Sequence, residues 1–235
     1  MEKASDTDAG RKYRDCIMID LSRLSERKIP LKLLCLGAHS DDIEIGCGGT
    51  VLSLIATGVP LDIEWCVLSG NEVRQAEALA AARGFTSGAH RCFIQQAHFE
   101  DSYFPAHARQ IKAWLMALRD RFTPDLIFTH GGADAHQDHR TAQELTWNVF
   151  RDQLVLEYEI PKWDGDLGQP NSYVALSADI LDKKIKLLMQ HFSSQRSKDW
   201  FDPETFRAIA RLRGMECRAP DRFAEAFHAR KLRLL

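Results

Sequence analysis

Short apolar runs alternate with longer helical patterns between residues 31 and 151. The runs have the length of buried strands, whereas the segments between them carry apolar residues at helical spacing. The predicted strands are 31–38, 61–68, 90–96 and 125–129, and the predicted helices are 48–57, 72–83, 109–121 and 141–151. Strands that alternate with helices favour a doubly wound sheet. The pattern therefore predicts an α/β fold with a Rossmann-like, mostly parallel sheet flanked by helices.

The last third of the chain follows a different pattern, in which short strands and helices surround a loop rich in Pro, Gly and Asp at 161–171. The predicted strands are 154–158, 173–176 and 222–227, and the predicted helices are 178–191 and 203–212. No repeat, low-complexity tract or Ser/Gly linker marks a domain boundary. The sequence thus predicts one domain over 1–235, with a lead-in at 1–30, a core at 31–150 and a C-terminal extension at 151–235.

Composition and charge narrow the class of protein. The 235 residues carry a formal net charge of −2, so no basic field indicates nucleic acid as a partner. No apolar run is long enough to span a membrane, and the first 30 residues lack a signal-peptide pattern, so we expect a cytoplasmic protein. The six cysteines form no CxxC pair and are expected to be reduced and structural. A reactive thiol at Cys47, in a glycine-rich stretch, is the alternative.

A histidine and two adjacent carboxylates, His39, Asp41 and Asp42, directly follow the first predicted strand. In an open α/β sheet this position is the crevice where ligands bind. Adjacent carboxylates repel each other unless a cation lies nearby, and a divalent metal would remove that repulsion. His39 and Asp42 can reach the same ion, which leaves Asp41 free. The alternative interpretation makes Asp41 or Asp42 a helix N-cap before the glycine-rich turn.

A second polar cluster follows the strand predicted at 125–129, so its loop is expected at the same edge of the sheet. Five groups fall within ten residues: His130, Asp134, His136, Asp138 and His139. Two histidines and one carboxylate with open coordination positions are a ligand set for zinc or for ferrous iron. The alternative is a solvated loop followed by a helix that Asp138 caps.

These residues resemble motifs of the LmbE/PIG-L family of N-deacetylases. Residues 36–50 (LGAHSDDIEIGCGGT) resemble the family's A-H-P-D-D-E-x-x-G-x-G-G motif, and residues 136–139 resemble its H-P-D-H motif. Ser40 and Gln137 replace the prolines of these motifs. The resemblance covers residues 31–150, and residues 157–177 are similar to bacterial members linked to amino-sugar, surface-polysaccharide and antibiotic biosynthesis.

The resemblance implies a zinc ion held by His39, Asp42 and His139, with Fe²⁺ or another divalent ion left open. It also implies Asp41 as the general base and His136 as the imidazole that helps to stabilise the oxyanion. A carboxylate that is adjacent in sequence to a metal ligand but free of the metal can take a proton from water and return it to the leaving amine.

The resemblance also places Arg74 and Asp101 at family positions that contact substrate hydroxyls. The alternative for these two is a surface ion-paired arginine and a turn aspartate. Trp163 lies in the 161–171 loop beside two aspartates, a combination suited to stacking on a sugar ring and to bonding its hydroxyls. We expect this loop to close the acceptor side of the site, so that the C-terminal extension covers the substrate.

The predicted function is that of a zinc-dependent hydrolase that removes an N-acetyl group from an amino sugar or its conjugate and releases acetate. Surface-polysaccharide, glycoconjugate or secondary-metabolite biosynthesis is the expected setting. An amidase that cleaves a thiol-sugar conjugate or another amide is the first alternative, and a non-catalytic sugar- or nucleotide-binding module is the second. The expected partner is a small-molecule amino sugar, without nucleic acid or a membrane span, and a homo-oligomer is left open.

Overall fold

The computed structural model describes residues 29–232, and the structural statements below refer to this part of the chain. The lead-in predicted at 1–30 lies outside it apart from its last two residues, as does Cys16. Seven strands form a single sheet: β1 (Leu31–Gly37), β2 (Leu61–Ser69), β3 (Arg91–Phe99), β4 (Leu126–His130), β5 (Leu154–Tyr158), β6 (Ser172–Leu176) and β7 (Phe223–Ala229).

The strand order is β3-β2-β1-β4-β5-β7-β6. The first five strands of this order pair in parallel, whereas β7 runs antiparallel to both β5 and β6. The sheet is therefore mostly parallel, and the C-terminal extension adds an antiparallel edge to it. This arrangement confirms the predicted α/β class with a mostly parallel sheet.

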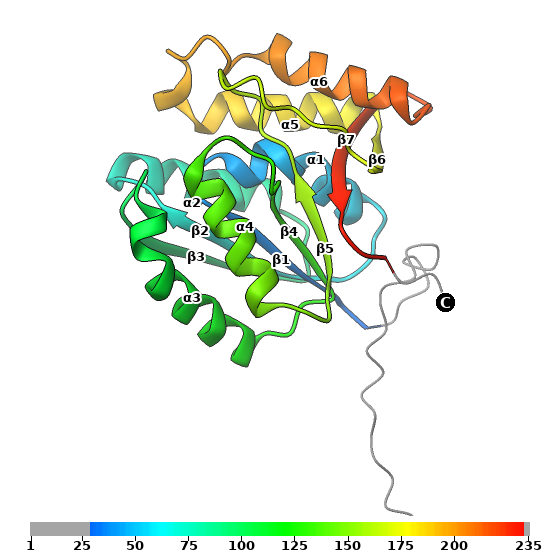
Figure 1. The fold of residues 1–235 in the computed structure, drawn as a ribbon. Coiled ribbons are helices and arrows are strands. Elements are labelled where there is room, and N and C mark those ends of the chain that lie inside the picture. Colours follow the sequence, from blue (N-terminus) through cyan, green and yellow to red (C-terminus); the bar gives the residue numbers. More distant parts are fainter. Residues whose placement is uncertain (1–28, 233–235) are drawn as a thin grey trace, which may run out of the picture.

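Six α-helices and one short 3-10 helix complete the described residues: α1 (Asp42–Ala56), α2 (Glu72–Phe85), α3 (Phe104–Arg121), α4 (Gln137–Val149), α5 (Ala178–His191), η2 (Ser193–Gln195) and α6 (Pro203–Glu216). Helices α3 and α4 cover one face of the sheet, and α1 and α2 cover the other, with α5 and α6 stacked beyond them (Figure 1). Within residues 29–232, no helix combines the length and apolarity needed to cross a bilayer.

The alternation of side chains along β1 explains this layering. Leu33 and Cys35 point into the core shared with α1 and α2, whereas Leu34 and Leu36 point into the core shared with α3 and α4. Both faces of the strand are thus buried, as is usual for parallel sheets covered by helices. This burial is why the strand reads as a continuous apolar run rather than as an alternating pattern.

Helix α1 begins six residues earlier than predicted, so the glycine-rich segment is helical rather than a turn. The glycines are there because neighbouring aromatic rings occupy the space that side chains would need. A Cβ at Gly46 would lie 2.2 Å from the ring of Tyr158, and one at Gly48 would lie 2.5 Å from the ring of Phe85. Close packing therefore offsets the low helix propensity of glycine at these positions.

The earlier start of α1 also changes the interpretation of Cys47. It lies in α1 and is fully buried, and this burial raises the pKa of its thiol well above the usual value. A buried thiol with a raised pKa is a poor nucleophile because little thiolate is present. The structure therefore supports a packing role for Cys47 and not the alternative of a reactive thiol.

A buried ion pair attaches the C-terminal extension to the core. The carboxylate of Glu225 on β7 accepts hydrogen bonds from the backbone N–H groups of Gly49 and Thr50, at 2.7 and 2.6 Å. The Lys184 ammonium on α5 donates to Glu225 and to the carbonyl of Ile45, both at 2.6 Å. One carboxylate thus joins α1, α5 and β7, and these bonds satisfy charges that would be costly to bury alone.

Gly46→Ala tests the packing of α1 against the sheet. We expect it to lower the free energy of unfolding by about 1–3 kcal/mol, because overpacking a filled site costs that much. Gly168→Ala is the control, since a Cβ there would meet nothing within 4 Å. Chemical denaturation measures both variants against the parent, and equal stability of all three proteins would contradict this packing.

Candidate metal centre

The centre lies where the strand order reverses direction. Strand β1 is followed along the chain by β2 on one side of it, whereas its other neighbour, β4, is followed by β5 on the far side. In doubly wound sheets, ligands bind in the crevice outside the carboxyl ends of the strands at such a switch point. The loop that leaves β1 and the loop that leaves β4 both open here, so both polar clusters of the sequence meet at this edge.

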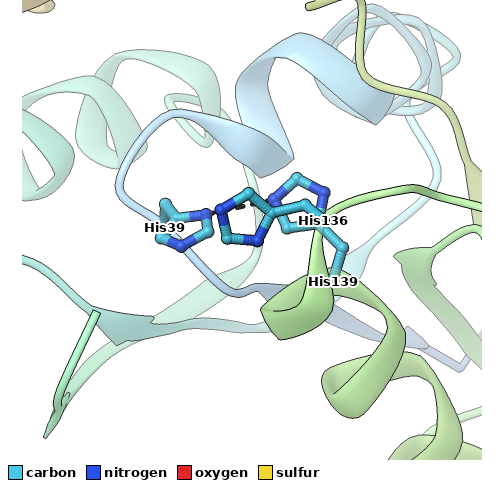
Figure 2. Close-up of side chains that lie close together, drawn as sticks. All are labelled: His39, His136 and His139. Carbon is cyan, nitrogen blue, oxygen red and sulfur yellow. Dashed lines mark hydrogen bonds between the residues drawn. The ribbon is translucent and has the colours of Figure 1, made fainter. Parts of the chain in front are cut away.

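Three imidazole rings face one another at this edge (Figure 2). His39 comes from the loop after β1, His136 is the N-cap residue of α4, and His139 lies in the first turn of that helix. The Nδ1 atom of His39 lies 3.1 Å from Nε2 of His139. The ring centroids of His39 and His136 are 4.8 Å apart.

Asp42 completes the predicted set of ligands. Its Oδ2 atom lies 3.4 Å from Nδ1 of His39, and its Oδ1 atom lies 3.6 Å from Nε2 of His139. In a tetrahedral site with ligand bonds of about 2.0–2.1 Å, neighbouring ligand atoms stand about 3.3–3.4 Å apart. The spacing of these three side chains therefore fits a divalent ion such as zinc.

Three groups of side chains that bring ligand atoms within 4.8 Å of one another overlap this set, and none contains all three of its members. They are His39 with His136 and His139, Asp42 with His130 and His139, and His39 with Asp101 and Asp138. His130 already accepts a hydrogen bond at Nε2 from the Ala38 N–H, at 2.9 Å. Burial lowers the pKa of His130 to about 4, so it is neutral at physiological pH.

Carboxylates contact the rings of the candidate ligands His39 and His139 on the side away from the centre. Oδ2 of Asp134 lies 2.8 Å from Nδ1 of His139, which leaves Nε2 of that ring to face the centre. Asp138 lies 3.4 Å from Nε2 of His39 and also accepts the backbone N–H groups of Ser102 and Phe104. Hydrogen-bonded carboxylates of this kind fix the tautomer and orientation of ligating histidines.

Of two helix-capping alternatives from the sequence, the one for Asp138 is wrong and the one for Asp41 holds in position only. Asp138 does not cap α4, because the side chain of His136 takes that place and accepts the Asp138 N–H at 3.2 Å. Asp41 stands at the N-cap position of α1 but makes no capping hydrogen bond there. Neither carboxylate is thus used in a capping hydrogen bond, and both remain available to the site.

The electrostatics of the cluster favour a cation. Burial alone would lower the pKa of His39, but the carboxylates of Asp42, Asp101 and Asp138 raise it well above the usual value. The pKa of Asp42 is held well below its usual value by the surrounding histidines, against the effect of burial. The pKa of Asp101 falls to about 2, mainly through its hydrogen bond to His39. This set of groups attracts positive charge at the point where the three candidate ligands converge.

Asp41 is buried beside the centre and pairs with Arg74, whose NH2 group donates to Oδ1 at 2.5 Å. Its other oxygen, Oδ2, has no hydrogen-bond partner among the described residues. Burial raises the pKa of Asp41, although Arg74 opposes the effect. Arg74 therefore lies inside the site against Asp41 and not in a surface ion pair.

One cavity of about 220 Å³ is lined by all eight predicted site residues: His39, Asp41, Asp42, Arg74, Asp101, His136, His139 and Trp163. Trp163 stands at its mouth with 67% of its surface exposed, and its Nε1–H donates to Asp199. Lys162, Lys198 and Trp200 also line the cavity, and sequence reasoning missed all three. They lie in irregular segments without a motif, so only the fold brings them to the site.

The family model described as PIG-L, GlcNAc-PI de-N-acetylase, matches residues 34–150. Through this domain, the chain belongs to the PIG-L family. The match covers both polar clusters and the helix that carries Arg74, and it ends where the C-terminal extension begins. Members of this family are named as deacetylases, so the family supports a deacetylase activity for the chain.

Similar proteins agree with the family. The chain is 26% identical over 192 residues to the uncharacterized deacetylase YaiS of Escherichia coli (strain K12), covering 75% of this chain and 98% of that protein. It is similar in structure to the N,N'-diacetylchitobiose deacetylase of Pyrococcus horikoshii, with a TM-score of 0.67 and 22% identity over 92% of this chain and 89% of the other.

The fold is also shared by an enzyme of another class. The 4-carboxy-2-hydroxymuconate hydratase GalB of Pseudomonas putida KT2440 matches with a TM-score of 0.71 and 18% identity, over 87% of this chain and 98% of the other. The likeness to this hydratase shows that the fold alone does not decide the reaction. The activity has to be argued from the side chains of the site.

Asp134→Asn tests whether this carboxylate supports His139. We expect the affinity for Zn²⁺ to fall by about 10–100-fold, as is typical when the partner of a ligand histidine is lost. Asp164→Asn, an exposed carboxylate of the same cavity, is the matched control and should keep the parent affinity. Titration against a chelator of known affinity measures the change, and parental affinity in the Asp134 variant would contradict the role.

Proposed function

We propose that the protein is a metal-dependent hydrolase that removes the N-acetyl group of an amino sugar or an amino-sugar conjugate and releases acetate. The observation that carries the proposal is the Oδ2 atom of Asp41, a buried carboxylate oxygen that has no hydrogen-bond partner within residues 29–232 and lies beside the three proposed metal ligands. A buried carboxylate that is next to a metal ligand but not needed as one is suited to act as a general base.

His39, Asp42 and His139 would hold the ion, for which we expect zinc; ferrous iron or another divalent ion fits the same donor types. When bound, such an ion supplies Lewis acidity that polarises the amide carbonyl and lowers the pKa of the attacking water. The protein supplies the shape of the site, the base and the donors around it.

Asp41 would take the proton of the attacking water at Oδ2 and later return it to the leaving amine nitrogen. Two features suit it to both steps. Burial raises the pKa of Asp41, which makes its carboxylate a stronger proton acceptor. The Arg74 guanidinium binds Oδ1 and leaves Oδ2 available for the proton. The net reaction consumes one water and one amide, and it gives acetate and a free amine.

His136 would donate a hydrogen bond to the oxyanion that develops on the amide oxygen. Its Nδ1 atom accepts the Asp138 N–H, so in the neutral ring the proton resides on Nε2. Burial lowers the pKa of His136, and the charges of His139 and His39 lower it further. A lowered pKa favours the neutral ring. A neutral ring with a fixed tautomer is a preorganised donor of the kind that stabilises such charge.

A sugar ring fits the mouth of the cavity better than a flat apolar compound. Trp163 presents an exposed aromatic face there, and the carboxylates of Asp101 and Asp164 line the same cavity. Aromatic faces stack on the apolar side of a pyranose, while carboxylates accept bonds from its hydroxyls. An amidase acting on a thiol-sugar conjugate would use the same residues, so the substrate has to be found by assay.

Asp41→Asn separates metal binding from turnover. We expect this variant to bind one divalent ion with the parent affinity and to lose acetate release by about 10²–10⁴-fold, because the proton acceptor is gone. Metal analysis together with an acetate assay on the metal-loaded protein measures both properties. Full activity of Asp41→Asn would refute the assignment of the base.

Trp163→Ala tests recognition of the sugar. We expect it to raise KM for an N-acetylated sugar several-fold, with the larger effect on KM than on kcat, because a ring that stacks on the substrate contributes to binding on the order of 1 kcal/mol. Trp163→Phe should restore most of the affinity, since it keeps an aromatic face. Steady-state kinetics of the metal-loaded variants decide, and an unchanged KM in Trp163→Ala would contradict the role.

A screen for acetate release tests the function as a whole. The metal-loaded protein is incubated with N-acetylated monosaccharides, nucleotide sugars and thiol-sugar conjugates, and free acetate and free amine are measured together. Equal amounts of both products from at least one amino sugar support the proposal. Cleavage confined to the thiol-sugar conjugates, or acetate release from none of the compounds, would contradict it.

A further inference from the structure

A second cavity, of about 290 Å³, lies next to the metal centre but has its own lining. It opens between the loop after β4, the end of β5, the segment 166–170 and β7. It shares only Ile160 with the cavity of the metal centre. No step of the proposed deacetylation uses this space.

The segment 159–170 is the partition between the two cavities. Trp163 and Asp164 face the metal centre, whereas Leu167 and Pro170 face the second cavity. Lys162 anchors the segment near its middle by bonding Asp134 at 3.1 Å and Asp166 at 2.5 Å. The loop predicted to cover the substrate therefore contributes different residues to each of the two cavities.

Arg213 anchors the partition at its two ends. This buried guanidinium binds both oxygens of Glu159, each at 2.7 Å, and also donates to the carbonyl of Gly168 at 3.1 Å. The Lys162 bonds and these bonds tie the segment to the rest of the fold. The cavity is thus bounded by a fixed wall and is not a gap under a loose loop.

The carboxylates around the second cavity are already engaged. Glu157 accepts bonds from Gln143 at 2.7 Å and from the indole of Trp147 at 2.6 Å, and Glu159 is held by Arg213. Asp166 accepts from Lys162 and from the Ala135 N–H. With these groups satisfied, the surface offered to a ligand is mainly apolar: Ile160, Leu167, Pro170 and Phe227.

Cationic and polar side chains stand at the rim. Arg230 and His228 line the cavity and each exposes about half of its side chain. The Arg230 guanidinium lies over Trp147, 4.5 Å from the ring centroid, and a single contact at 3.4 Å joins it to Glu157. A guanidinium has five N–H donors in a fixed fork, so Arg230 keeps donors for an anion.

We propose that the second cavity binds a small amphipathic anion, with an apolar ring system against Leu167 and an acidic group at Arg230. The exposed face of Leu167, of which 43% is accessible, supports this occupant because an apolar ring would cover it. The Arg230 guanidinium at the rim supports the acidic group. The ligand can be the aglycone of a larger substrate or a separate small molecule, and both have the same chemistry here.

Asp134 links the two cavities. This carboxylate lines the second cavity and bonds both His139 in the metal centre and Lys162 in the partition. A ligand that contacts the loop after β4 therefore acts on the same side chain that orients a metal ligand. Occupancy of the second cavity is expected to alter turnover as well as binding.

Binding of 1-anilinonaphthalene-8-sulfonate, an aromatic sulfonate of the proposed class, tests the site. Fluorescence titration of the full chain should show a saturable site. Leu167→Glu and Arg230→Gln should each weaken it by at least about fivefold, which is the scale of one lost ionic or apolar contact. Leu212→Glu is the control, because Leu212 is 45% exposed on α6 outside the cavity.

Parental affinity in the Leu212 variant together with weakened binding in the other two supports the site. No saturable binding, or equal affinity in all four proteins, overturns it. This titration needs no turnover, so it stands or falls apart from the proposed function.

A kinetic experiment tells whether the ligand is the aglycone of a substrate or a separate molecule. This experiment rests on the proposed function. It compares N-acetylglucosamine with its 4-carboxyphenyl glycoside. A higher kcat/KM for the glycoside that Leu167→Glu and Arg230→Gln abolish would identify an aglycone site. Sulfonate binding that leaves this preference unchanged would identify a separate ligand.

Discussion

The structure depends on how it compensates the repulsion among carboxylates gathered at one edge of the sheet. Asp41 and Asp42 are adjacent and buried, and Asp101, Asp134 and Asp138 lie around the same histidines. Such a group of charges is stable only with compensating positive charge. Arg74 compensates Asp41, Lys162 compensates Asp134, and the convergence of His39, Asp42 and His139 is where a divalent ion would compensate the rest.

The C-terminal extension contributes the other half of this arrangement. The Lys184–Glu225 pair holds β7 and α5 against α1, and Arg213 and Lys162 hold the loop between β5 and β6. Lys184 and Lys162 therefore join segments of the extension to the core that carries the metal centre, whereas Arg213 fixes the loop within the extension. The extension forms one wall of the metal cavity and the whole of the partition behind it, and we expect it to set specificity.

The sequence allowed the order and type of the elements to be predicted because the central strands β1, β2, β4 and β5 are distinct apolar runs between helical patterns. It did not allow the start of α1 to be predicted, since glycine at 46 and 48 reads as a turn unless the rings of Tyr158 and Phe85 are known to lie against it. The tertiary contact, not the local propensity, decides the conformation there.

The same limit applies to the site. Two polar clusters could be placed at one edge because both follow strands, and all eight candidate residues line one cavity. The role of Asp134 behind His139 depends on how its loop folds back, and Lys162 comes from beyond another strand. Neither position carries a sequence pattern that distinguishes it from a solvated loop, and the second cavity has none either.

An anomalous difference map from crystals grown with one equivalent of Zn²⁺ and collected at the zinc edge tests the central claim most directly. The account predicts a single peak about 2.0–2.2 Å from nitrogen atoms of His39 and His139 and from an oxygen of Asp42. It also predicts that Asp41 stays outside bonding distance. No peak, or a peak held by the three histidines without Asp42, would contradict it.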